Sequence, residues 1–94
     1  MSSSQEEKFL NALSRRIAEL RKREGFTQEK LASESSMDRV AIANIETGKR
    51  RPTVTTIFRI ATALNVETKE FFDNLQSPPH ITQKDTVGFL WVLY

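Results

Sequence analysis

The chain contains no cysteine and a single histidine, His80, among its 94 residues. Without cysteine it cannot form a disulfide, a thiolate metal site or a thiol nucleophile. One histidine leaves almost no material for a metal cluster or a Ser/His catalytic pair. We therefore expect no metal, no cofactor and no enzymatic activity, and we interpret His80 as an exposed linker residue.

Glycine and proline are also scarce, with three of each, which favours long helices over many tight turns. No apolar run approaches the roughly 20 residues of a transmembrane helix. The N-terminus lacks the basic and apolar regions of a signal peptide. We therefore expect a cytoplasmic protein with no membrane partner. Hydrophobic residues at 38% and charged residues at 28% are typical of one globular domain.

The charge is unevenly distributed along the chain, whose net charge is +2. Residues 1–60 carry 12 Lys and Arg against 8 Asp and Glu, whereas residues 61–94 carry 2 against 4. A local basic excess is typical of a surface that faces phosphates, but it also occurs on ordinary soluble surfaces. Charge alone does not choose between these interpretations.

Hydrophobic spacing and capping residues predict five helices. The first runs from about Gln5 to Glu24, starts at a Ser4–Glu7 capping box and is closed by Gly25. Its apolar positions share one helical stripe: Phe9, Leu10, Leu13, Ile17 and Leu20.

Two short helices follow, and only two or three residues connect them. Thr27 is the predicted N-cap of the second helix, which the Ser33–Ser36 stretch ends. Asp38 is the predicted N-cap of the third helix, which Gly48 closes. Such a short connection forces the two helices to cross steeply.

Two more helices complete an all-α domain that we predict for residues 1–75. Thr53 caps the fourth helix and Asn65 stops it. A short fifth helix, opening at residue 67 or 68, carries Phe71 and Phe72. The fourth helix is predicted from apolar residues at helical spacing: Val54, Ile57, Phe58, Ala61 and Leu64.

Residues 76–94 form a separate segment in this prediction. Pro78 and Pro79 favour an extended, stiff linker. Every residue of Val87–Tyr94 except Gly88 is apolar, and the β-branched and aromatic content favours a strand. An unpaired strand of this kind is prone to aggregate, so it must fold back on its own domain or pair with a second chain. The stiff linker favours pairing with a second chain.

Three sequence pieces stand in register: TQEKLA at Thr27–Ala32, IANIETGKRRP at Ile42–Pro52 and IATALNV at Ile60–Val66. Together they resemble the lambda repressor/Cro-like helix-turn-helix family, also called the XRE family, over about Ile17–Phe72. The resemblance implies a five-helix lambda-repressor-like fold. It also implies a DNA-binding regulator of transcription from a bacterium or a phage.

The third predicted helix is short enough to enter a DNA major groove, which is about 12 Å wide. Its face opposite Ile42 and Ile45 carries small and hydrogen-bonding side chains. Arg39 can donate twice to guanine, Asn44 can pair with adenine, and Val40 can touch a thymine methyl. The alternative is an ordinary solvent-facing surface. The candidate base-contacting residues of helix 38–47 are Arg39, Val40, Ala43 and Asn44.

Phosphate contacts are implied at the start of the second predicted helix and in the loop after the third. The resemblance implies that Gln28 bonds a phosphate and supports the third helix, and backbone N–H groups beside Thr27 can also bind phosphate. Arg16 or Lys22 could add contacts from the first helix. The basic loop after Gly48 resembles the family's contact with the sugar-phosphate backbone, although charge runs are often solvated loops. That loop consists of Lys49, Arg50 and Arg51.

The resemblance further implies a structural ion pair between Arg21 and Glu46 that bridges the first and third helices. Asp38 is unusual at the mouth of a groove, because a carboxylate repels phosphate. We interpret Asp38 mainly as an N-cap. If it contacted a base, its carboxylate could only accept a hydrogen bond from the amino group of cytosine. It is expected to reduce non-specific affinity.

One helix contacts only a few base pairs, so we expect a homodimer that places two copies about 34 Å apart on a palindromic operator. The family often dimerises through its last helices, which implies Phe71, Phe72 and Leu75. The tail offers a second candidate interface: Phe89, Trp91 and Leu93.

Two classes of function stay open. A sequence-specific transcriptional regulator, a class that includes restriction-modification controllers and antitoxins, is favoured by Arg39, Asn44 and the basic loop. The alternative is a protein-interaction module, or an antitoxin-type regulator, whose C-terminal tail binds a partner protein. Since the chain has no separate ligand domain, we expect no small-molecule ligand.

Overall fold

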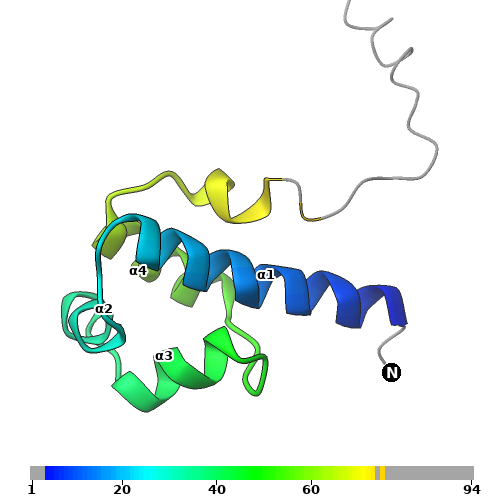
Figure 1. Cartoon of the computed structure of the whole chain (residues 1–94), viewed down its shortest axis with the longest axis horizontal. Coiled ribbons are helices and arrows are strands. Elements are labelled where there is room, and N and C mark those ends of the chain that lie inside the picture. Colours follow the sequence, from blue (N-terminus) through cyan, green and yellow to red (C-terminus); the bar gives the residue numbers. More distant parts are fainter. Residues whose placement is uncertain (1–3, 74, 76–94) are drawn as a thin grey trace, which may run out of the picture.

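Four α-helices and one 3₁₀ helix make up the part of the chain that the computed structural model describes, residues 4–73 and 75 (Figure 1). This part contains no strand. The helices are α1 (Ser4–Arg23), α2 (Gln28–Ser35), α3 (Arg39–Glu46), α4 (Val54–Leu64) and η1 (Thr68–Phe72). The strand predicted for Val87–Tyr94 lies outside the described residues.

The core is formed by one apolar face of each helix. α1 packs against α3 on one side and against η1 on the other, and α2 packs against both α3 and α4 (Figure 1). Burial of these side chains is the main favourable term in folding. The largest fully buried residues are Ile17, Leu20, Leu31, Ile42, Ile45, Ile60, Leu64 and Phe71.

All four α-helices end in the same way, with a left-handed residue just after the helix or one residue further on. The residue after each left-handed one donates its backbone N–H to the carbonyl five residues earlier. Gly25, Gly48 and Asn65 are the predicted stops, with φ of 78°, 82° and 59°. Ser36, with φ of 58°, is a non-glycine residue in the same conformation, and composition alone does not mark it.

The second to fifth helices begin where the sequence predicts, and two of the predicted cap side chains form their hydrogen bonds. The hydroxyls of Thr27 and Thr53 accept the backbone N–H groups of Lys30 and Thr56, at 3.0 and 3.1 Å. At the first helix the prediction is off by one residue at each end. Ser4, the predicted cap, is itself the first helical residue, and the helix ends at Arg23 instead of Glu24.

The predicted fifth helix is a five-residue 3₁₀ helix, η1, so the described residues contain four α-helices instead of five. η1 is held in place by contacts on two of its sides. Phe71 is fully buried in the core, and the carbonyl of Glu70 accepts a hydrogen bond from Arg16 Nε at 2.8 Å. These two contacts hold the segment against the core and against α1.

A second contact of Glu70 fastens η1 to the end of α1. Arg23 Nη2 lies 3.0 Å from Glu70 Oε1 and also reaches Glu24. The hydrogen bond from Arg23 holds the pKa of the Glu70 carboxyl below its usual value of 4.5. The same carboxylates raise the pKa of Arg23. The contact therefore stabilises the charged forms of both side chains.

The predicted apolar stripe of α4 needs one correction. Ile57 and Ala61 are buried, whereas Val54 is 84% and Phe58 62% exposed. Helical spacing places all of them on one broad side of the helix, but only part of that side has a neighbour to pack against.

Candidate nucleic-acid interface

The α2–α3 unit has the geometry of two helices joined by a tight turn. Only Ser36, Met37 and Asp38 separate the two helices. Met37 packs against the core, and its N–H bonds the carbonyl of Ala32 at 2.8 Å. Figure 1 shows α2 nearly end-on while α3 lies across the view, so the two helices cross steeply, as the short connection predicts.

α3 is divided into a buried face and an open face. Ala41, Ile42 and Ile45 are buried. The four predicted base-contacting side chains lie on the other faces: Arg39 and Val40 are exposed, and Ala43 and Asn44 are half-buried. Val40 is 58% exposed, so its side chain can be reached from outside the domain. The sequence-predicted set is therefore brought together on one helix, and its contact with DNA stays a prediction.

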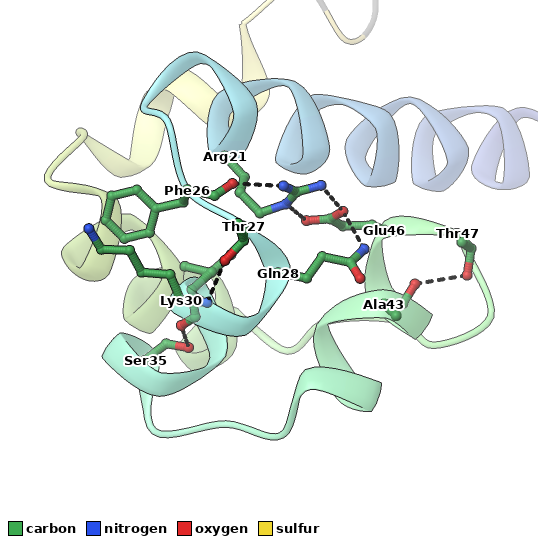
Figure 2. A network of polar contacts seen from close by, with 10 residues as sticks. Arg21, Phe26, Thr27, Gln28, Lys30, Ser35, Ala43, Glu46 and Thr47 are labelled. Atoms are coloured by element: carbon green, nitrogen blue, oxygen red, sulfur yellow. Dashed lines mark hydrogen bonds and ion pairs between the residues drawn. The ribbon is translucent and has the colours of Figure 1, made fainter.

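The predicted Arg21–Glu46 pair is formed in the structure (Figure 2). Arg21 Nε donates to Glu46 Oε2 at 2.6 Å, and Nη2 donates to Oε1 at 2.9 Å. The third guanidinium nitrogen donates to the carbonyl of Phe26 at 2.8 Å. Both charged side chains are almost buried, with 10% and 4% exposed. Such a bidentate pair fixes geometry strongly.

Gln28 joins the same network. Its Nε2 donates to Glu46 Oε1 at 3.0 Å, so the side chain supports α3 as the resemblance implies. The sequence does not reveal that Glu46 is the partner. Thr27 uses its hydroxyl to cap α2. The phosphate contacts predicted for Gln28 and Thr27 are not tested by these internal bonds.

Asp38 corrects the expectation that its side chain caps α3. Its backbone has the extended conformation of an N-cap, but its carboxylate makes no cap hydrogen bond. The side chain is exposed, so water can satisfy its oxygens in place of the helix. The Asp38 side chain therefore does not cover the first N–H groups of α3.

The basic loop after α3 has a defined path. The N–H groups of Lys49 and Arg50 both bond the carbonyl of Asn44, at 2.9 and 3.1 Å. Gly48 makes the turn with its positive φ. Lys49, Arg50 and Arg51 are all exposed, and the loop is held beside the end of α3.

The residues predicted to dimerise have different surroundings. Phe71 is fully buried in the core of its own chain, so its side chain cannot meet a second copy in this fold. Phe72 is 44% exposed and Leu75 is half-buried. The other three predicted residues lie outside the described residues: Phe89, Trp91 and Leu93.

No group of three potential His, Cys, Asp or Glu metal ligands occurs within residues 4–73 and 75. Over the same part of the chain, no helix has both the length and the apolar character required to cross a bilayer.

The helix-turn-helix family model matches residues 17–71, more than half of the chain. The protein therefore belongs to the XRE-type helix-turn-helix family, as the three motifs predict.

Similar proteins include regulators of known structure. The restriction-modification controller protein C.AhdI from Aeromonas hydrophila is 38% identical, with 67% of this chain and 96% of that chain covered and a TM-score of 0.65. The controller C.Esp1396I, solved as a tetramer with its natural 35 base-pair operator, is 36% identical, with 71% and 88% covered and a TM-score of 0.66. The uncharacterized HTH-type transcriptional regulator y4dJ of Sinorhizobium fredii is 33% identical over 67 residues, which are 71% of this chain and 87% of that protein.

Proposed function

We propose that this protein is a sequence-specific DNA-binding regulator of transcription, without catalytic activity, that inserts α3 as its recognition helix into the major groove. The open face of α3 carries this proposal. Arg39 can contact a guanine edge, Asn44 an adenine edge, and Val40 a thymine methyl. None of these side chains is needed to fill the core.

Unpaired positive charge around α3 supports the same function. Arg39, Lys49 and Arg50 make no ion pair or side-chain hydrogen bond with any residue of the described part of the chain. Cations left free in this way are available to phosphate oxygens. On α1 and η1, Arg16, Arg23 and Lys69 pair with neighbouring carboxylates, whereas the exposed Lys8, Arg15 and Lys22 form no such pair with the described residues.

The similar proteins support a regulator of the controller type. C.AhdI and C.Esp1396I are restriction-modification controllers, and the second is solved on its operator. Among the alternatives that the sequence left open, this similarity favours a controller over an antitoxin. A homodimer on a palindromic operator follows from the reach of one helix, because two copies about 34 Å apart contact successive major-groove faces.

Selection from a random pool of DNA duplexes tests the proposal. We expect an enriched inverted repeat, a retarded complex in a mobility-shift assay, and a mass for that complex that contains two chains. Absence of a retarded band even at low salt would contradict DNA binding and would leave the protein-interaction module as the better hypothesis.

A further inference from the structure

A hollow of about 210 Å³ lies between α1 and the loop that follows α3. Asn11 and Ser14 line it from α1, and Gly48 and Arg50 line it from the loop. A Cβ atom added to Gly48 would lie 3.3 Å from Asn11 Oδ1 and 3.9 Å from Ser14 Oγ. The loop therefore passes close to α1, and a glycine keeps the hollow open at this point.

Three polar side chains around the hollow have no hydrogen-bond partner among residues 4–73 and 75: those of Asn11, Ser14 and Arg50. Ser14 is the most informative, because it is only 5% exposed. A buried hydroxyl without a partner destabilises a fold, and native structures supply nearly all such groups with one. By contrast, the equally buried Ser35 donates to the carbonyl of Leu31 at 2.6 Å.

The chemistry of the three groups is that of an oxyanion site. A serine hydroxyl, an asparagine amide and a guanidinium are all donors, and the guanidinium adds a positive charge. Phosphate oxygens in protein–DNA complexes are bound by these same groups. The hollow is too small for a large ligand, since pockets for drug-sized molecules hold roughly 300–1,000 Å³.

We propose that Asn11, Ser14 and Arg50 form a phosphate site that receives one backbone phosphate of the bound DNA. This inference rests on the proposed function. Sugar-phosphate strands flank the major groove, and the loop bearing Arg50 leaves the end of α3 and passes the middle of α1 (Figure 1). α1 thereby becomes a DNA-contacting helix in addition to packing the core.

Glu7 also lines the hollow and makes no ion pair with the described residues. It is exposed, one turn before Asn11. A carboxylate at this place opposes an incoming phosphate by like-charge repulsion. Its removal therefore has the opposite effect from removal of the donors, and a gain in affinity cannot result from misfolding.

Two donor variants test the site. Ser14→Ala and Asn11→Ala should each weaken binding to the selected operator about tenfold, which is the usual effect of losing a hydrogen bond to a charged group. The salt dependence should not change, because both residues are neutral. The melting temperature of Ser14→Ala should stay constant or rise, since no internal bond is lost. Gln5→Ala, another exposed amide of α1, is the matched control and should bind as wild type.

The charge variant completes the test. Glu7→Gln should bind the operator several-fold more tightly, and the gain should exceed that of Glu34→Gln, which makes the same charge change on α2. In a titration with inorganic phosphate followed by NMR, the amide signal of Gly48 should shift in wild type and stay in place in Ser14→Ala.

The outcomes separate this inference from the proposed function. If wild type binds DNA and both donor variants bind it equally well, the phosphate site is overturned while the regulator remains. If inorganic phosphate shifts Gly48 but the donor variants keep full DNA affinity, the hollow takes a free phosphate-bearing ligand and the proposal is overturned. If wild type binds no DNA, both are overturned.

Discussion

Arg21 and Glu46 face each other across the first and third helices and share two hydrogen bonds of 2.6 and 2.9 Å. Glu46 also accepts from Gln28 at the start of α2. One carboxylate therefore connects α1, α2 and α3 (Figure 2). It fixes the direction of α3 relative to both of its neighbours.

Replacing Glu46 with alanine should lower the free energy of unfolding by roughly 3–5 kcal/mol, because it leaves the guanidinium of Arg21 buried without its partner. Urea unfolding measures the change. Glu67→Ala is the control. Lys69 Nζ lies 3.6 Å from Glu67 Oε1, and both side chains are largely exposed. Exposed ion pairs of this kind contribute about 1 kcal/mol at most. An equal effect of the two substitutions would contradict a structural role for Glu46.

Arg39→Ala should cost about 1–3 kcal/mol of binding free energy on the selected operator and should relax the sequence preference at one base pair. Binding curves on operators changed at single positions measure both effects. Arg15→Ala removes the same charge from the side of α1 that lines a hollow with Asp73 and Leu75, and it should leave the preference intact. Uniform weakening on all sequences would show that Arg39 contacts phosphate alone.

Arg50→Ala should weaken binding to all sequences alike and lower the slope of log affinity against log salt by about one unit, because one phosphate contact is lost. Titrations at several salt concentrations give the slope. A change that depends on the base sequence would instead place Arg50 against base edges.

The Glu70–Arg23 contact predicts a pH dependence of stability. The pKa of Glu70 is lowered in the folded chain, so the contact stabilises the fold above the unfolded-state pKa and is lost as the pH falls through the folded value. Wild type should therefore have a higher melting temperature than Glu70→Gln at neutral pH. The difference between the two melting temperatures should decrease as the pH falls below 4.5. A gap that does not change with pH would contradict the ionic contribution.

Removal of residues 80–94 should leave the helicity of the domain intact and shift a dimer toward monomer, because the apolar tail is a predicted interface. Circular dichroism and sedimentation measure the two properties. Phe72→Glu in the full chain is the companion variant, since Phe72 is exposed beside the core. If only Phe72→Glu dissociates the dimer, the interface lies at η1 and the tail has another role.

Helix positions and the helix-turn-helix unit could be predicted because local chemistry sets them. Gly25, Gly48 and Asn65 adopt the left-handed conformation that ends a helix, and Thr27 and Thr53 cap the next ones. The Arg21–Glu46 pair was implied by the family resemblance. Local spacing could not predict it, because the two residues lie 25 positions apart in the sequence.

Features that depend on tertiary neighbours could not be predicted. Val54 and Phe58 share the helical period of the buried residues but lie where none of the helices of residues 4–73 covers them. Phe71 sits in the core although its position favoured an interface equally well. The free hydroxyl of Ser14 can be recognised only once the loop after α3 is seen beside α1.

The proposed recognition helix, α3, contains only eight residues, and an isolated helix of that length is not stable in water. Its contact surface therefore exists only while α1 and α2 hold it in place. A partly unfolded molecule therefore does not bind DNA with reduced affinity through that surface, because unfolding removes the whole surface at once. Destabilising substitutions far from DNA should therefore reduce the number of competent molecules and leave the affinity of each competent molecule unchanged.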